Sequence, residues 1–400
     1  MPRWRSHAVN LALAALTLTA GAALAELWAR HVARARAARA EQGEGRLVTR
    51  HPLLGWAKRP GAEAWLVRPE YRVHLQVNEA GLRGPLVEGP PPPGQERVLL
   101  LGDSFTEGYT VEEGDTVRAR LQALLAAGGR AAQVVNGGTR GYSTDQEYLF
   151  YREEGQLYQA RVVVLLFYYN DLYGNASADN GKPAFTLEGG QLHMHPPAPA
   201  STERNDPAYR PDHLVAWRHS MALRLLSDRT ARANPRLHDA LAGLGLVEPI
   251  EHTAPPEMWP FGDRHPAEVA DMWRVTSALL AALDREVIAH GAHLLVVYVP
   301  ARFEVYDAAW ATTRERWGMG AGWRREAVEE DLDARCRALR VPLLDLRAAL
   351  RAAAAGARVY LHVDDHWTAA GNAVAAREIA RALPSAAGPP VHGRAPRPAA

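Results

Sequence analysis

The stretch Val98-Leu99-Leu100-Leu101-Gly102-Asp103-Ser104 (residues 98–104) is an apolar run that stops at a glycine and continues with an acid and a serine. Four apolar residues bounded by a glycine are typical of a strand buried on both faces. Glycines at positions 102 and 108 allow a tight exit into a following helix. The pattern predicts a serine placed as a nucleophile, and a strand that simply ends in a capping serine is the alternative.

Three further segments pair a buried strand or a loop with chemically useful side chains. A short apolar strand opens into a glycine-rich loop over residues 136–146, where a backbone amide can approach a substrate closely. The strongest buried-strand signal, residues 161–169, ends in Asn170, whose side-chain amide can donate a hydrogen bond. Near the C-terminus, Asp364 and His366 supply a base and a carboxylate to orient it. Taken singly, the loop and the Asn-Asp pair are also consistent with ordinary turns.

In this order, the Gly-Asp-Ser, glycine-loop, Asn-Asp and Asp-x-His segments resemble the SGNH (GDSL-type) hydrolase family over about residues 96–383. The Asp-x-His-Trp form of the last segment is similar to the envelope and polysaccharide-modifying branches of that family. The third segment departs from the family's usual Gly-x-Asn-Asp, because Tyr168 stands where the glycine would be. This departure concerns the shape of the acyl pocket more than the chemistry.

The resemblance implies one role for each matching residue. The catalytic set is Ser104 as nucleophile, His366 as base and Asp364 behind the histidine. The oxyanion donors are the backbone N–H groups of Ser104 and Gly141 and the side chain of Asn170.

The chemistry of ester cleavage requires the same three groups, a serine, a histidine and a carboxylate. A serine hydroxyl attacks well only when a base removes its proton, and histidine suits that task. A carboxylate on the far ring nitrogen fixes the tautomer. Asp365 adjoins His366 and is the alternative to Asp364, which we favour because side chains one residue apart usually diverge. Asp103 is expected to brace the turn.

A metal site at the C-terminal acids and histidines is the competing interpretation. His362 and His366 with the two aspartates between them are metal-ligand types, but no second cluster elsewhere completes a site. We therefore predict no metal and no cofactor.

Composition indicates an ordinary folded enzyme. The chain has 400 residues, 47% hydrophobic and 23% charged, with a net charge of +1, so a sizeable core is expected and a nucleic-acid surface is not. Its single cysteine, Cys336, lies in a helical pattern and is expected to be buried packing.

The N-terminus carries a targeting signal. Arg3 and Arg5 precede an apolar run over residues 8–24, which is near the lower limit for spanning a bilayer and ends at Ala23-Leu24-Ala25, a signal-peptidase pattern. Retention as an anchor through residues 8–27 and cleavage after Ala25 are both open. Arginines after the run favour a cytoplasmic enzyme by the positive-inside rule. We nevertheless expect an extracytoplasmic catalytic domain, in the periplasm or at the cell surface, because the resemblance points to envelope enzymes.

Strand and helix patterns alternate and predict an α/β fold with a mainly parallel sheet. The resemblance implies a three-layer α/β/α sandwich of the flavodoxin-like kind with five strands. The expected segments are a signal peptide or anchor (residues 1–28), a basic helical spacer with a small β connector (29–95), the catalytic domain (96–383) and a disordered tail (384–400). Residues 175–264 read as an insertion with a β-hairpin that roofs the cleft.

The function expected from these residues and this resemblance is a serine esterase that removes a small acyl group, such as acetyl, from a carbohydrate or lipid-like ester. A polysaccharide O-acetyltransferase would use the same acyl-serine, and a catalytically silent carbohydrate-binding scaffold would keep only the fold. The expected substrate is a small ester or an acylated polysaccharide. Protein partners are not predicted.

Overall fold

The computed structural model describes residues 3–42, 44–177, 181–197, 220–247 and 254–384. They fall into two units, one formed by residues 1–42 and 200–252 and the other by residues 43–199 and 253–400. The larger unit contains the sheet and every residue predicted to act in catalysis. The expected tail lies outside the described residues from 385 onward, as do residues 198–219 of the expected insertion.

The larger unit is built on one parallel five-stranded sheet, as predicted. Its strands are β5 (Glu96–Gly102), β6 (Ala132–Asn136), β7 (Val162–Tyr168), β10 (His293–Val299) and β11 (Leu343–Asp345). The order across the sheet is β11-β10-β7-β5-β6, and each neighbouring pair runs parallel. Because parallel strands end at one edge, the loops after β5, β6 and β7 lie next to each other.

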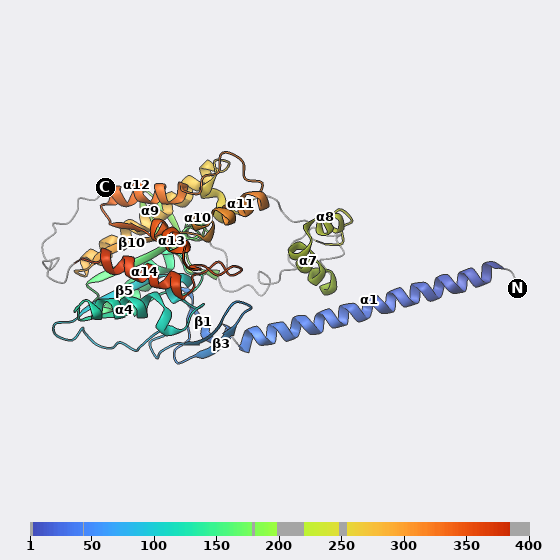
Figure 1. Ribbon diagram of the computed structural model, residues 1–400, viewed down its shortest axis with the longest axis horizontal. Helices are drawn as coiled ribbons and strands as arrows, with labels where there is room; N and C mark the ends of the chain where they lie inside the picture. Colours follow the sequence, from blue (N-terminus) through green and yellow to red (C-terminus); the bar gives the residue numbers. More distant parts are fainter. Residues whose placement is uncertain (1–2, 43, 178–180, 198–219, 248–253, 385–400) are drawn as a thin grey trace. The chain divides into compact units, whose positions relative to one another are not determined.

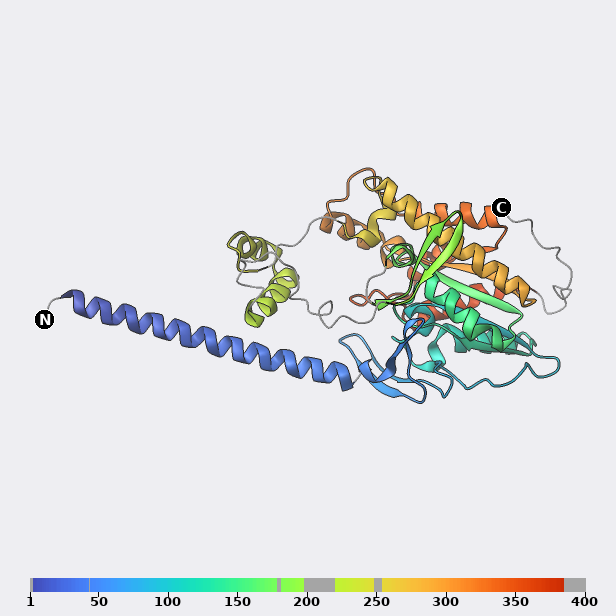
Figure 2. The ribbon, with the colours of Figure 1, turned by 180° about the vertical axis from the view of Figure 1, so that it is seen from behind.

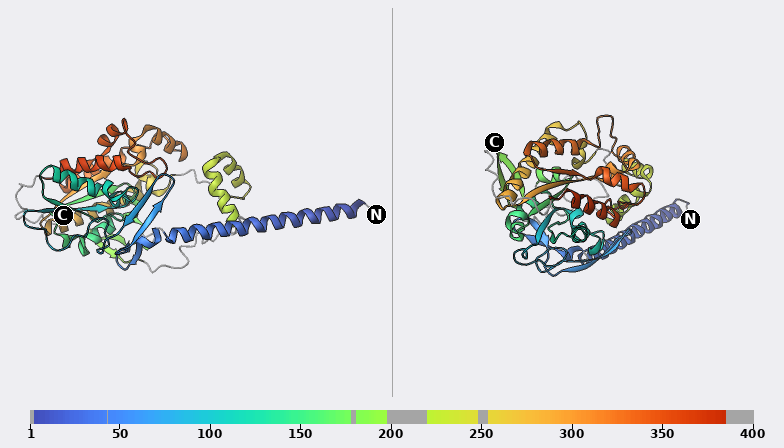
Figure 3. Two further views of the ribbon diagram at one scale, coloured as in Figure 1. Left: turned by 60° about the horizontal axis from the view of Figure 1, so that its bottom comes forward. Right: turned by 60° about the vertical axis from the view of Figure 1, so that its left-hand side comes forward.

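Helices cover both faces of the sheet, because alternate residues of each buried strand point to opposite faces. Leu99 and Leu101 join one core, whereas Val98 and Leu100 join the other. The first core contains α5 (Thr144–Glu153), α9 (Pro266–Ala289) and α12 (Ala327–Leu339). The second contains α4 (Val117–Ala127), α13 (Arg347–Ala354) and α14 (Ala369–Ala382), with α4 and α14 side by side in Figure 1. Figure 3 shows helices on both sides of the sheet.

Two antiparallel hairpins precede the sheet, where the sequence predicted a connector with a small β element. The first pairs β1 (Val48–His51) with β2 (Gly55–Lys58), and the second pairs β3 (Glu63–Val67) with β4 (Arg72–Gln76). They have a small core of their own, which includes Leu47, Leu66 and Leu75. Apolar and polar residues alternate along β4, and Val73 and Leu75 are buried.

The predicted hairpin after Asn170 is present as β8 (Ala184–Glu188) and β9 (Gln191–His195). Figure 2 shows it lying against α9. The other elements of the larger unit are short: α2 (Glu44–Leu47), α3 (Ser104–Glu107), α6 (Asp171–Ala176), α10 (Arg302–Val305), α11 (Asp307–Arg316), η1 (Glu113–Asp115), η2 (Gly155–Tyr158) and η5 (Pro256–Phe261). Cys336 is buried in α12, as expected.

The smaller unit consists of helices. Among the residues that the structure describes, these are α1 (Arg3–Gln42), α7 (Met221–Ala233) and α8 (Pro235–Gly243). Glu26 of α1 accepts hydrogen bonds from Ser220 Oγ and from two backbone N–H groups at the start of α7, at 2.9–3.1 Å. These bonds fix the two helices to each other.

The apolar run over residues 8–24 forms part of α1. Among the residues that the structure describes, none of the helices combines the length and the apolar character needed to cross a membrane. The membrane segment expected at residues 8–27 is therefore not supported.

Candidate active site

Ser104 begins a short helix directly after β5, because the chain turns sharply at the preceding glycine. Gly102 has a φ of +148°, and a Cβ there would lie 2.1 Å from Thr106 Oγ1, so a larger residue does not fit. The carboxylate of Asp103 accepts the N–H of Phe105 at 2.9 Å and caps the helix, which matches its expected role as a brace. The turn thus presents Ser104 at the carboxyl edge of the sheet.

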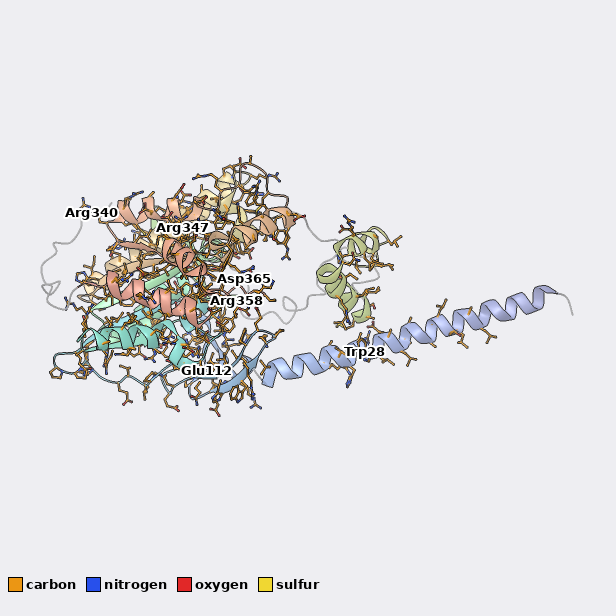
Figure 4. The ribbon with its side chains drawn as sticks, viewed as in Figure 1. Trp28, Glu112, Arg340, Arg347, Arg358 and Asp365 are labelled. Atoms are coloured by element: carbon orange, nitrogen blue, oxygen red, sulfur yellow. The ribbon has the colours of Figure 1, made fainter. Side chains whose placement is uncertain are left out.

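The structure brings Ser104, His366 and Asp364 into one hydrogen-bonded chain. Ser104 Oγ lies 2.8 Å from His366 Nε2, and His366 Nδ1 lies 2.7 Å from Asp364 Oδ1. With the Nδ1 proton donated to the carboxylate, Nε2 has a lone pair that accepts the serine proton. Figure 4 draws the side chains of the described residues and labels Asp365, which lies between Asp364 and His366 in the sequence.

Asp365, the alternative to Asp364, faces another partner. It has a φ of +64°, and its carboxylate accepts a hydrogen bond from Arg302 Nη1 at 3.2 Å. Spacing by two residues therefore places Asp364 at the imidazole, and the left-handed residue between them turns its own side chain away.

Hydrogen bonds and nearby charges shift the pKa values of His366 and Asp364. Burial by itself would lower the pKa of His366, but the hydrogen bond to Asp364 and the negative charges of Asp103 and Asp364 raise it above its ordinary value. For Asp364 burial acts in the opposite direction and would raise the pKa. The hydrogen bonds from His366 and from two phenol hydroxyls nevertheless hold the pKa of Asp364 below its usual range. Those hydroxyls belong to Tyr109, 2.9 Å from Oδ1, and Tyr71, 3.2 Å from Oδ2.

The two remaining oxyanion candidates lie on the loops beside Ser104. Gly141 follows β6 with a φ of +76° and faces the ring of Trp56, where an added Cβ would lie 3.2 Å from the indole. Asn170 follows β7, and its side-chain Oδ1 has no hydrogen-bond partner among the described residues. Since β7, β5 and β6 are neighbours, the sheet gathers both residues at the edge that carries the serine.

A buried ionic network holds the loop that carries Gly141. Lys58, at the end of the first hairpin, donates to Gly138 O and to Thr139 Oγ1, the latter at 2.7 Å. Glu107 accepts the Arg140 backbone N–H at 2.7 Å and its guanidinium at 2.8 Å. Burial lowers the pKa of Lys58 to about 8, and Arg140 and Lys58 together outweigh burial to lower the pKa of Glu107 to about 2. Both ends of the network are therefore charged at neutral pH.

Aromatic rings line the other side of the histidine. Phe105 packs on the His366 ring at 4.6 Å between centroids and on Tyr168 at 4.8 Å. Tyr169 packs instead on Phe261. The rings of Tyr168 and Tyr169 also pack on each other, 4.6 Å between centroids, and Trp367 is buried in the core.

Sequence reasoning missed several residues that touch the site. Tyr71, Tyr109, Glu70 and Lys58 all contact the loops of the predicted catalytic residues, yet three of them lie in the hairpins before the sheet. Of these four residues, Tyr109 is the one that sequence reasoning could have found, because it directly follows Gly108, which ends the helix that begins at Ser104. As for metals, the described residues contain no group of three or more His, Cys, Asp or Glu side chains able to hold an ion.

One family model matches the C-terminal part of the chain. Residues 259–399 match the family described as SGNH hydrolase-like domain, acetyltransferase AlgX. No curated protein matches the chain.

Similar solved structures include Axe2, an acetylxylan esterase from Geobacillus stearothermophilus (13% identity, 72% of this chain and 93% of that one, TM-score 0.36). TesA is 13% identical over 71% of this chain and 96% of its own (TM-score 0.33). LAE5, an alpha/beta hydrolase enzyme from the metagenome of Lake Arreo, Spain, is 13% identical over 72% and 97% (TM-score 0.36).

Proposed function

We propose that this chain, which belongs to the SGNH hydrolase family, is a serine esterase that acts on small acyl esters such as acetyl esters of a carbohydrate. The observation that carries the proposal is the hydrogen-bonded chain from Ser104 Oγ through His366 to Asp364. A serine in such a chain loses its proton to the imidazole as it attacks an ester carbonyl.

The reaction then has two halves. Ser104 Oγ bonds to the acyl carbon while its proton moves to His366 Nε2, and the tetrahedral oxyanion faces the backbone N–H groups of Ser104 and Gly141 and the Asn170 amide. Collapse releases the alcohol, which takes the proton from His366. A second hydroxyl, from water or a sugar, attacks the acyl-serine as His366 accepts its proton. Collapse breaks the acyl–Oγ bond, His366 passes that proton to Ser104 Oγ, and the acid or the new acyl ester leaves.

Acetyl transfer is the second candidate, favoured by the acetyltransferase in the description of the matching family. The two reactions differ only in the hydroxyl that attacks the acyl-serine. Incubating the purified chain with a chromogenic acetyl ester, with and without an oligosaccharide acceptor, separates them. Free acetate in both samples indicates an esterase, and acetylated sugar indicates a transferase.

A covalent probe tests the nucleophile directly. A fluorophosphonate should label the wild-type chain and the control Ser277→Ala, whose serine lies in α9, but not Ser104→Ala. Equal labelling of Ser104→Ala would refute the assignment, and no labelling of any variant would favour a silent scaffold.

We also propose that the catalytic unit works outside the cytoplasm. The apolar run over residues 8–24 and the Ala23-Leu24-Ala25 pattern support export. A reporter that is active only in the periplasm, fused after Pro384, should give signal. A silent periplasmic reporter with an active cytoplasmic one would refute the proposal.

A further inference from the structure

The turn between β3 and β4 reaches the loop that carries Asp364. The carboxylate of Glu70, in this turn, accepts three successive backbone N–H groups, those of His362, Val363 and Asp364, at 2.6, 2.7 and 2.9 Å. The next residue, Tyr71, donates its hydroxyl to Asp364 Oδ2 at 3.2 Å. Two adjacent side chains of one hairpin thus hold both the backbone and the carboxylate of Asp364.

The loop needs such support because of its backbone. Asp365 adopts a left-handed conformation that residues with a Cβ rarely take, and it lies between Asp364 and His366. Arg302 binds the Asp365 carboxylate, at 3.2 Å, and Glu70 binds the amides that precede it. Contacts on either side therefore keep the loop in the one conformation that points Asp364 at the imidazole.

The carboxylate of Asp364 is also fixed in rotation. Oδ1 receives His366 Nδ1 and the Tyr109 hydroxyl, at 2.7 and 2.9 Å, whereas Oδ2 receives Tyr71. The two tyrosine rings pack edge to face, 6.0 Å apart, so each positions the other. Loss of the Tyr71 hydroxyl leaves Oδ2 without this donor.

We propose that the β3–β4 turn is a positioning device for the catalytic acid, in which Glu70 sets the loop backbone and Tyr71 sets the carboxylate of Asp364. Glu70 and Tyr71 are then positioning residues, and the turn that carries them does more than connect β3 to β4. The inference rests on the proposed function, since it assigns the residues that keep the proposed triad in line.

The test compares Glu70→Ala, Glu70→Gln and Tyr71→Phe with Glu63→Ala, all in the full chain. Glu63 is an exposed acid on β3 of the same hairpin, so its loss reports general damage to the hairpin. With a chromogenic acetyl ester, Glu70→Ala should lower kcat by about 10²-fold at nearly constant KM, since small misplacements of catalytic groups have effects of that size. Glu70→Gln keeps an acceptor oxygen and should recover most of the rate.

Tyr71→Phe removes a single oxygen atom, so it tests the proposal even if Glu70→Ala does not fold. We expect kcat to fall about 3- to 10-fold, as for loss of one hydrogen bond. The acid limb of its pH profile should move to higher pH, because a carboxylate with fewer donors favours the protonated imidazole. The proposal would be overturned if a folded Tyr71→Phe kept the wild-type kcat and the wild-type acid limb of the pH profile. It would also be overturned if Glu63→Ala lost as much kcat as Glu70→Ala.

A spectroscopic readout separates this inference from the proposed reaction. The low-field proton NMR signal of His366 Nδ1–H, bonded to Asp364, can be followed without substrate. It should broaden or disappear in Glu70→Ala and persist in Glu63→Ala. A wild-type chain that is not labelled by fluorophosphonate would contradict the reaction alone, whereas an unchanged signal in Glu70→Ala would contradict the positioning role.

Discussion

Replacing Lys58 by Met should damage activity far more than stability. Lys58 is 4% exposed and its ammonium donates to Gly138 O and Thr139 Oγ1. Two hydrogen bonds from a charged donor contribute about 3–6 kcal/mol to stability. Against this, lowering the pKa of Lys58 from 10.5 to about 8 corresponds to a cost of about 3 kcal/mol for burying the charge. The net loss is therefore about 0–3 kcal/mol, and the variant should fold.

For catalysis, removing the buried charge of Lys58 brings no gain that offsets the lost hydrogen bonds. Without Lys58 the loop over residues 137–142 loses its charged contact with the first hairpin and keeps the hydrogen bonds that Trp56 makes with Arg140 and Tyr142. The proposed oxyanion donor Gly141 is then held less firmly. Removal of one oxyanion donor costs about 10²–10³ in kcat in other enzymes, which sets the upper limit here. We expect kcat for a small acetyl ester to fall at least 10-fold at nearly constant KM.

The measurement pairs ester turnover with thermal unfolding. Arg59→Met is the matched control, because Arg59 is the exposed neighbour of Lys58 and has one long hydrogen bond, of 3.4 Å, to Val48 O. The melting temperature of Lys58→Met should fall by no more than about 10 °C. A folded Lys58→Met with a kcat within about twofold of wild type would refute the reasoning, as would an equal loss in Arg59→Met.

Three further outcomes are expected. Asp364→Asn should lower kcat by about 10⁴-fold, as a wrong histidine tautomer does elsewhere, whereas Asp365→Asn should have a much smaller effect; the reverse order in steady-state kinetics would exchange their roles. Because His366 acts as a base only when neutral and its pKa is raised, kcat/KM should fall with decreasing pH through a value above 6.5, and a limb below 6.5 would contradict this. Replacing residues 200–252 by a Gly/Ser linker should preserve turnover of a small ester but abolish action on an acylated polysaccharide, and equal activity on both would show that the segment does not restrict the substrate.

The sheet could be predicted because its strands are marked locally. Residues 294–299 are an unbroken apolar run and form most of β10, just as residues 98–101 form the centre of β5. A continuous run of Val and Leu needs no distant partner to be recognised as a buried strand. The catalytic residues could be predicted for the same reason, since each lies just after a strand or just before a helix.

The support of the site could not be predicted in this way. Glu70 and Lys58 are ordinary polar residues in their own hairpins, and only the fold brings them to loops that are distant in the chain. Spacing already favoured Asp364 over Asp365, but the left-handed backbone at Asp365 is not marked in the sequence, because contacts from other segments stabilise it.

The distance in sequence between the two halves of the site has a consequence for how the protein is made. Ser104 and His366 are 262 residues apart, and Glu70 and Asp364 are 294 apart. At ribosomal rates of about 5–20 residues per second, the serine is synthesised about 10–50 s before its base. A serine without a base is a poor nucleophile, so the nascent chain is inert toward the esters around it. Reactivity begins only when the last loop has docked, which makes the enzyme silent throughout its own synthesis.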